Sequence, residues 1–126
     1  MIEYISGGGL PLAPLPYSPA TRAGNFVFVS GQGSTDENGN IVGDTFEGEF
    51  RRTIQNLKKI LQAAGSDLNK IVQVKAYLRE SSSWDEYNIL YKQYFTEPYP
   101  ARTTLTGCLP DSIRFEIDCI AVVEKP

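Results

Sequence analysis

The segment from Ile113 to Val123 constrains the fold more than any other part of the sequence, because its side chains alternate as in a β-strand. One face is apolar throughout and carries Ile113, Phe115, Ile117, Cys119 and Ala121. The other face is charged at Glu116 and Asp118 and then turns apolar at Ile120 and Val122. We expect helices to cover the first face. The mixed second face predicts burial against another copy of the protein.

Residues 45–64 are predicted to form the first covering helix. Their apolar side chains recur at steps of three and four, which places them on one stripe. Asp44 is the expected N-cap and Glu47 its capping-box partner, while Gly65 supplies the stop.

A second helix follows the capping-box pair Ser83 and Glu86 and ends before Pro98. Its apolar positions are mostly aromatic: Trp84, Tyr87, Leu90, Tyr91, Tyr94 and Phe95. An aromatic stripe at helical spacing is more typical of a core than of a cofactor site, so we interpret it as packing.

The remaining strands are expected at residues 2–5, 26–30, 71–78 and within 100–110. The strand at 26–30 is apolar on both faces, which favours a central position, and that at 71–78 should bury Val72, Val74, Ala76 and Leu78. Two helices can cover only one face of such a sheet. The sequence therefore predicts a single α+β domain, residues 1–126, with a mixed sheet and both helices on one side.

Two loops carry further expectations. The proline-rich segment from Pro11 to Pro19 should be extended, with its apolar residues Leu10, Leu12, Leu15 and Tyr17 pinned against the domain. Gly31 ends the strand at 26–30, where a glycine permits close approach of a ligand or another backbone.

Composition excludes several kinds of chemistry. The 126 residues contain no histidine, which excludes histidine-based triads, histidine-based ribonuclease centres and nearly every histidine-ligated metal site. Cys108 and Cys119 lack metal-ligand spacing; buried, reduced thiols are expected, with a disulfide between them as the alternative. The net charge of −3 without a basic cluster disfavours nucleic acid. No membrane span or signal peptide is visible, so a cytoplasmic protein is expected.

The stretch from Pro100 to Pro110 holds the strongest candidate site residue, Arg102. On a strand it shares one face with Thr104 and Thr106. An arginine fork beside hydroxyls suits a small carboxylate. The alternative is an edge-strand arginine that reaches water or pairs with an acidic side chain. Similarly, Tyr17 is either a packing residue whose hydroxyl is exposed to solvent or a site residue.

Several fragments spread over the chain resemble the Rid family of reactive intermediate/imine deaminases, also called the YjgF or endoribonuclease L-PSP family. They are Pro16-Tyr17-Ser18, Val29-Ser30-Gly31-Gln32, Asn56-Leu57, Ala63-Ala64-Gly65, Tyr87-Asn88, Tyr91, Phe95, Pro100-Ala101-Arg102, Leu109-Pro110, Glu116-Ile117 and Ile120-Ala121-Val122. The resemblance implies a chorismate-mutase-like subunit. Three copies would form a homotrimer around a central β-barrel, with a site at each interface.

The resemblance also implies roles for individual residues. Arg102 would bind the substrate carboxylate, Glu116 would activate a water molecule, and Tyr17 would line the cleft. The other implied substrate contacts are Ser30, Gly31, Tyr87, Asn88, Thr103 and Thr104. The activity would be that of a 2-iminobutanoate/2-iminopropanoate-type deaminase, which converts 2-imino or enamine acids to 2-oxo acids and ammonia without metal or cofactor.

Two alternatives stay open from sequence. One is a trimer that binds small carboxylates without turnover. The other is an endoribonuclease or translation inhibitor, which the acidic composition disfavours. Well-known family members carry cysteine at the position of Thr104, and its loss is not expected to abolish imine hydrolysis. The segment between Arg102 and Leu109-Pro110 is one residue shorter than in those members, which leaves open a subfamily that acts on something other than small aliphatic imines, for instance an aminomuconate-type deaminase.

Overall fold

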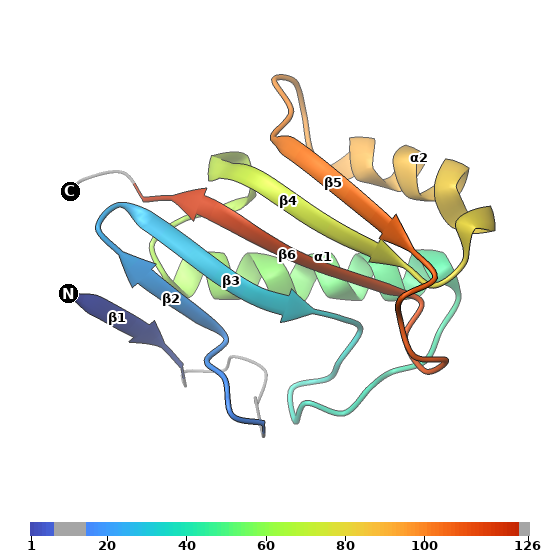
Figure 1. Cartoon of the computed structure of the whole chain (residues 1–126), viewed down its shortest axis with the longest axis horizontal. Coiled ribbons are helices and arrows are strands. Elements are labelled where there is room, and N and C mark those ends of the chain that lie inside the picture. Colours follow the sequence, from blue (N-terminus) through green and yellow to red (C-terminus); the bar gives the residue numbers. More distant parts are fainter. Residues whose placement is uncertain (7–14, 124–126) are drawn as a thin grey trace.

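The computed structural model describes residues 1–6 and 15–123, whose strands form one six-stranded sheet (Figure 1). Its strands are β1 (Ile2–Ile5), β2 (Ala20–Ala23), β3 (Phe26–Gln32), β4 (Ile71–Leu78), β5 (Ala101–Thr106) and β6 (Phe115–Val122). Their order is β1-β2-β3-β6-β4-β5, and every pair is antiparallel except β4 with β5. The predicted mixed sheet is therefore confirmed, and β3 is internal as expected.

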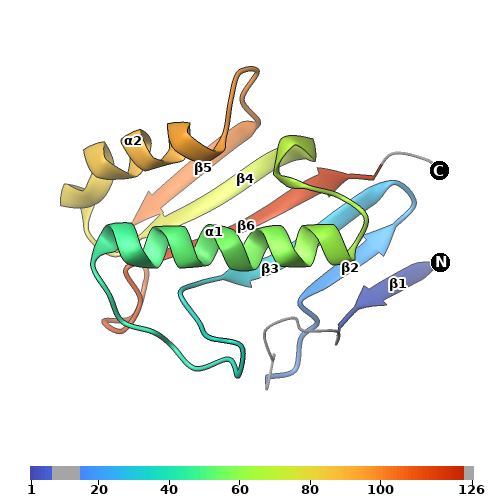
Figure 2. The same cartoon turned by 180° about the vertical axis from the view of Figure 1, so that it is seen from behind.

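Two helices, α1 (Phe46–Ala63) and α2 (Trp84–Tyr94), lie on the same face of the sheet (Figure 2). Helix α2 forms the crossover between the parallel strands β4 and β5. Short 3₁₀ turns at Leu68–Lys70 and Ser81–Ser83 precede β4 and α2. The predicted α+β arrangement with both helices on one side is thus confirmed.

The core lies between this helix layer and the sheet. Phe50 of α1 packs against Phe115 of β6 with ring centroids 4.6 Å apart, and Tyr87 of α2 completes the aromatic cluster. All three side chains are fully buried. Most of the predicted stripe does form core, with Tyr87, Leu90, Tyr91 and Phe95 buried, whereas Trp84 is exposed.

The caps of both helices differ from the sequence prediction. Thr45, not Asp44, is the N-cap of α1, and its hydroxyl accepts a hydrogen bond from the Gly48 amide at 3.1 Å. The Ser83 hydroxyl makes no capping bond. A 3₁₀ turn leads directly into α2 and gives Ser83 near-helical backbone angles, which are unlike the extended N-cap conformation.

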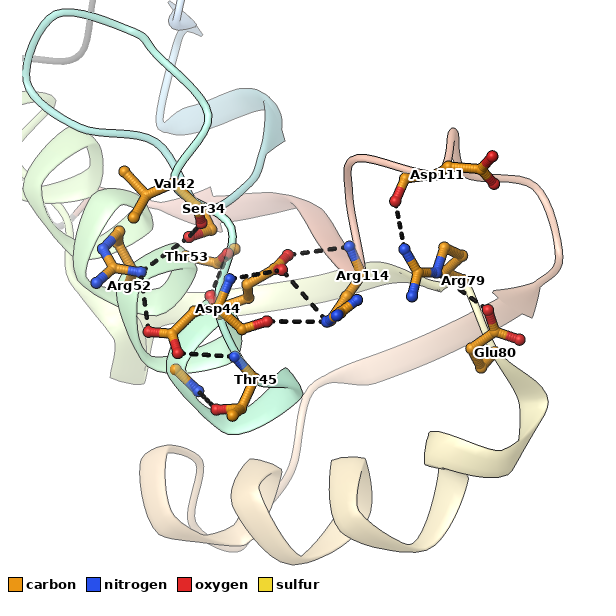
Figure 3. A network of polar contacts seen from close by, with 12 residues as sticks. Ser34, Val42, Asp44, Thr45, Arg52, Thr53, Arg79, Glu80, Asp111 and Arg114 are labelled. Atoms are coloured by element: carbon orange, nitrogen blue, oxygen red, sulfur yellow. Dashed lines mark hydrogen bonds and ion pairs between the residues drawn. The ribbon is translucent and has the colours of Figure 1, made fainter.

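Glu49 is a buried carboxylate to which sequence reasoning gave no role. It accepts the Arg114 amide at 2.9 Å and the Asp44 amide at 3.2 Å, and the Arg114 guanidinium lies 3.6 Å away. Figure 3 shows Arg114 reaching Asp44 across this cluster. Glu49 therefore joins the start of α1 to the segment that leads into β6. A charge within the buried stripe of α1 was the available sequence signal.

Replacing Glu49 with alanine should lower the free energy of unfolding by about 2–4 kcal/mol, because two backbone amides lose their acceptor in a buried place. Glu47 is a matched control on the same helix. Its exposed pair with Arg51 should contribute at most about 1 kcal/mol. Urea denaturation of both variants at equal protein concentration measures the difference, and equal losses would contradict the role of Glu49.

Three local expectations are wrong. Val72 is exposed, because the register shift between Ile71 and Gln73 turns it away from the core. Cys108 is exposed, since it follows β5 in a surface turn, whereas Cys119 is buried, and both are free thiols. Leu15 and Tyr17 are also exposed and are not pinned against the domain. Leu10 and Leu12 lie outside the described residues.

The face of the sheet opposite the helices is partly apolar. Phe26 and Phe28 of β3 lie opposite Val122 and Ile120 of β6, and both phenylalanines are more than 40% exposed (47% and 43%). Leu105 of β5 adds another exposed apolar side chain. We refer to this surface as the open face.

Candidate functional site

Arg102 lies on β5, the edge strand, on the same face of the sheet as the helices. Its register partner is the buried Val74, which fixes this orientation. The guanidinium carbon lies 4.9 Å from the ring centroid of Tyr87, 4.8 Å from that of Tyr91 and 6.0 Å from that of Trp84. Three rings of α2 thus hold this cation by cation–π contacts.

No carboxylate among residues 1–6 and 15–123 pairs with Arg102, so no described acidic side chain neutralises its positive charge. Its neighbour Thr104 shares a 2.9 Å hydrogen bond with the Tyr87 hydroxyl. Burial raises the pKa of the Tyr87 phenol, although Thr104 and the charge of Arg102 oppose the rise. Tyr87 therefore remains a neutral support for the cation.

A pocket of about 290 Å³ opens beside Arg102. It is lined by Asn88, Tyr91, Lys92, Tyr99, Pro100 and Arg102. This cationic pocket contains two positive side chains and no acidic one, which suits a small organic acid.

Glu116 belongs to a second pocket of about 330 Å³, where Tyr17, Gly31 and Ile113 are among its neighbours. We refer to it as the Glu116 pocket. Burial, followed by the charge of Asp118, raises the pKa of the half-buried Glu116 carboxyl. No lysine or arginine of the described chain lines this pocket.

Gly31 allows the close packing of Glu116. Two residues of β3, Ser30 and Gly31, face one residue of β6 in a β-bulge, since Val29 pairs with Cys119 and Gln32 with Ile117. A Cβ atom on Gly31 would lie 2.7 Å from the Glu116 Oε2 atom. Any other residue at this position would displace the carboxylate.

Arg102 and Glu116 lie on opposite faces of the sheet. Arg102 is in register with buried Val74, whereas Glu116 lies opposite Tyr77 on the open face. A single chain therefore does not bring the two predicted catalytic residues together. It presents two separate half-sites.

The remaining candidates divide between these half-sites. Tyr87, Asn88 and Thr104 lie with Arg102. Thr103 points to the open face, since its register partner is Lys75. The Ser30 hydroxyl donates to the Ser18 carbonyl oxygen at 2.6 Å and so holds the Tyr17 segment beside the bulge.

Asn56 is a further residue whose function the sequence did not reveal. Its side-chain amide nitrogen donates to the carbonyl oxygens of Gly33 and Thr35, both at 3.1 Å. It thereby fixes the loop after Gly31 from helix α1. Its sequence signals were an amide beside the apolar stripe of the helix and its place in the Asn56-Leu57 fragment that resembles the family.

Residues 1–6 and 15–123 present neither a metal-binding cluster nor a membrane-spanning helix. No group of three or more histidine, cysteine, aspartate or glutamate side chains is arranged to hold a metal ion. None of the described helices is long and apolar enough to cross a membrane.

The fold and the two half-sites define a small α+β protein with a cationic pocket and an acidic pocket on opposite faces of one sheet. The sequence profile of the family described as "Endoribonuclease L-PSP" matches residues 10–123. The chain belongs to this family, the Rid or YjgF family that its motifs resemble.

Named relatives agree with this assignment. The chain is 39% identical over 126 residues to a RutC family protein of Pyrococcus horikoshii, which covers 98% of this chain and 100% of the relative. It is 32% identical over 122 residues to the human protein named 2-iminobutanoate/2-iminopropanoate deaminase, covering 95% and 89% of the two chains. The crystal structure of RidA from an Antarctic Psychrobacter has a TM-score of 0.88 at 30% identity, with coverage of 96% and 99%.

Proposed function

We propose that this protein is a cofactor-independent deaminase that hydrolyses 2-imino and enamine acids to 2-oxo acids and ammonia. The observation that carries the proposal is Arg102, a cation held by aromatic rings with no carboxylate partner among the described residues, in a pocket with no acidic lining. The printed names of relatives from human and from Dermatophagoides farinae support the same activity.

The proposed reaction uses a carboxylate clamp and an activated water molecule. Arg102 binds the substrate carboxylate with two parallel hydrogen bonds, which orients the C=N bond. Glu116 accepts a proton from water as the water oxygen bonds to the C=N carbon. The nitrogen of the tetrahedral adduct receives that proton. Glu116 then moves the remaining hydroxyl proton to the same nitrogen, so that the C–N bond breaks, ammonia leaves and a C=O bond forms. Atoms and charge balance without an electron acceptor.

The active assembly is proposed to be a homotrimer with sites between subunits. Arg102 and Glu116 face opposite sides of one sheet, so the cationic pocket of one copy must meet the Glu116 pocket of another. The exposed apolar side chains of the open face provide a surface for such association. A cytoplasmic location stays a prediction.

A direct assay tests the activity. An amino-acid oxidase generates a 2-imino acid in the presence of semicarbazide, and the protein competes with the trapping reaction. Added protein should lower the rate of semicarbazone formation and raise the rate of 2-oxo acid release. Tight binding of pyruvate without any change in these rates would instead favour the carboxylate-binding trimer.

Mixing two inactive variants tests the shared site. Arg102→Ala and Glu116→Gln chains, refolded together in equal amounts, should recover about a quarter of wild-type activity, because a quarter of the interfaces combine both intact residues. Refolding Arg102→Ala chains with the double variant is the control and should restore nothing. Failure of the first mixture would show that no interface joins these residues.

The alternative of an endoribonuclease has no supporting geometry in the described residues. RNA cleavage that persists through stringent purification and is lost in Glu116→Gln would support the endoribonuclease alternative.

A further inference from the structure

Tyr77 and Asp118 form a pair next to Glu116 that the proposed reaction has not yet used. All three side chains lie on the open face, because Tyr77 is directly opposite Glu116 and Asp118 follows Glu116 by two residues. The Tyr77 hydroxyl donates a 2.7 Å hydrogen bond to Asp118 Oδ2. Tyr77 therefore bonds not to Glu116, its register partner, but to Asp118, two residues further along β6.

This arrangement leaves the charge of Asp118 intact. Lys75 is the residue directly opposite Asp118, yet the two make no ion pair. The partner of Asp118 is instead a phenol, whose pKa the hydrogen bond to Asp118, together with burial, raises to about 12. A neutral donor fixes the carboxylate in place without cancelling its charge.

None of the described lysines and arginines lines the Glu116 pocket, and Lys75 lies opposite Asp118 rather than Glu116. The ionisable groups that face Glu116 or its neighbours come from several elements: Asp118, Tyr77, Lys75, Glu49, Tyr17 and Cys108. Arg114 is turned to Asp44 and Glu49. Asp118 lies about 7 Å along the strand from Glu116, close enough for repulsion between the two charges. A carboxylate that is repelled by its neighbour accepts a proton more readily.

We propose that Tyr77 and Asp118 are positioning residues for Glu116: the phenol holds a charged carboxylate beside Glu116 and so makes Glu116 a stronger base toward the bound water. This inference rests on the proposed function only for the identity of the reaction. The ionisation of Glu116 can be followed without any substrate.

The first test is the Asp118→Asn variant. NMR of ¹³C-labelled glutamate carboxyls in the full-length protein follows the titration of Glu116, which the Glu116→Gln variant assigns. We expect Asp118→Asn to move this titration to lower pH, and to move the acid limb of the kcat/KM profile in the same direction. The matched control is Asp111→Asn, which removes the same charge from an exposed turn and should leave both curves in place.

The second test separates charge from structure. In Tyr77→Phe, Asp118 loses its hydrogen bond and can form an ion pair with Lys75. Because that pair offsets the negative charge beside Glu116, the Glu116 titration should again move to lower pH. Adding Lys75→Met to that variant should reverse the movement, which a purely structural role of Tyr77 does not predict.

The outcomes distinguish the two proposals. An unchanged Glu116 titration in folded Asp118→Asn overturns the positioning role, whatever the activity. If Asp118→Asn shifts the Glu116 titration but the wild-type protein does not turn over imines, the positioning role of Tyr77 and Asp118 is supported and the proposed reaction is contradicted.

Discussion

Substituting Arg102 with lysine should reduce kcat/KM for 2-imino acids about 10- to 100-fold, although the charge is retained. Lysine offers one compact ammonium group, so it cannot make the two parallel hydrogen bonds by which a guanidinium orients a carboxylate. The weaker contact removes about 1.5–3 kcal/mol of transition-state binding. Steady-state kinetics with imines generated in situ measures the loss.

Arg51 provides a matched control for this substitution. It lies over the Tyr94 ring at 5.8 Å, a cation–π contact like that of Arg102, but it pairs with Glu47 and lines neither pocket. Arg51→Lys should therefore leave kcat/KM within about twofold of wild type. If both substitutions reduced activity equally, Arg102 would have no special role as a carboxylate clamp.

Substituting Gly31 with alanine should lower kcat about 100-fold while the fold is retained, since displacement of a catalytic group by about 1 Å has effects of this size. The added methyl group would lie 2.7 Å from Glu116 Oε2, so the carboxylate must move. The backbone itself tolerates the change, because Gly31 is not among the glycines with positive φ. Thermal unfolding checks the fold, and single-turnover kinetics checks the chemical step.

Gly33→Ala is the control two residues away. A Cβ atom there would meet its nearest neighbour, the Phe115 carbonyl oxygen, at 3.8 Å, an ordinary contact. It should retain nearly full activity. Combining Gly31→Ala with Glu116→Gln should cost little more than Glu116→Gln alone, because both act through one carboxylate. Additive losses would mean that Gly31 contributes by some other route.

Most elements of the fold could be predicted because they depend on local periodicity, whereas the four-residue strand β2 (Ala20–Ala23) was not predicted. The strand at Ile71–Leu78 was predicted with the observed bounds, and the strict alternation of residues 113–123 identified the core face of β6. The errors arise where a local rule competes with tertiary structure. The bulge that exposes Val72 depends on pairing with β6, and Thr45 rather than Asp44 has the extended backbone and the side-chain bond to the Gly48 amide that define the N-cap.

The site was predictable only in its parts. Arg102 and Glu116 are identified by residue type and by resemblance, but their placement on opposite faces depends on the parallel pairing of β5 with β4, which is not a local signal. Glu49 and the Tyr77–Asp118 pair are defined by contacts between residues 65 and 41 positions apart in the chain. Only the assembled sheet brings those partners together.

The opposite orientation of Arg102 and Glu116 has a consequence for how activity depends on concentration. An isolated chain contains both Arg102 and Glu116 but cannot bring them to the same substrate. On the proposed scheme, specific activity should therefore fall when the protein is diluted below the dissociation constant of the assembly. Turnover would then report the degree of association, and a solute that loosens the contact between copies would act as an inhibitor without entering either pocket.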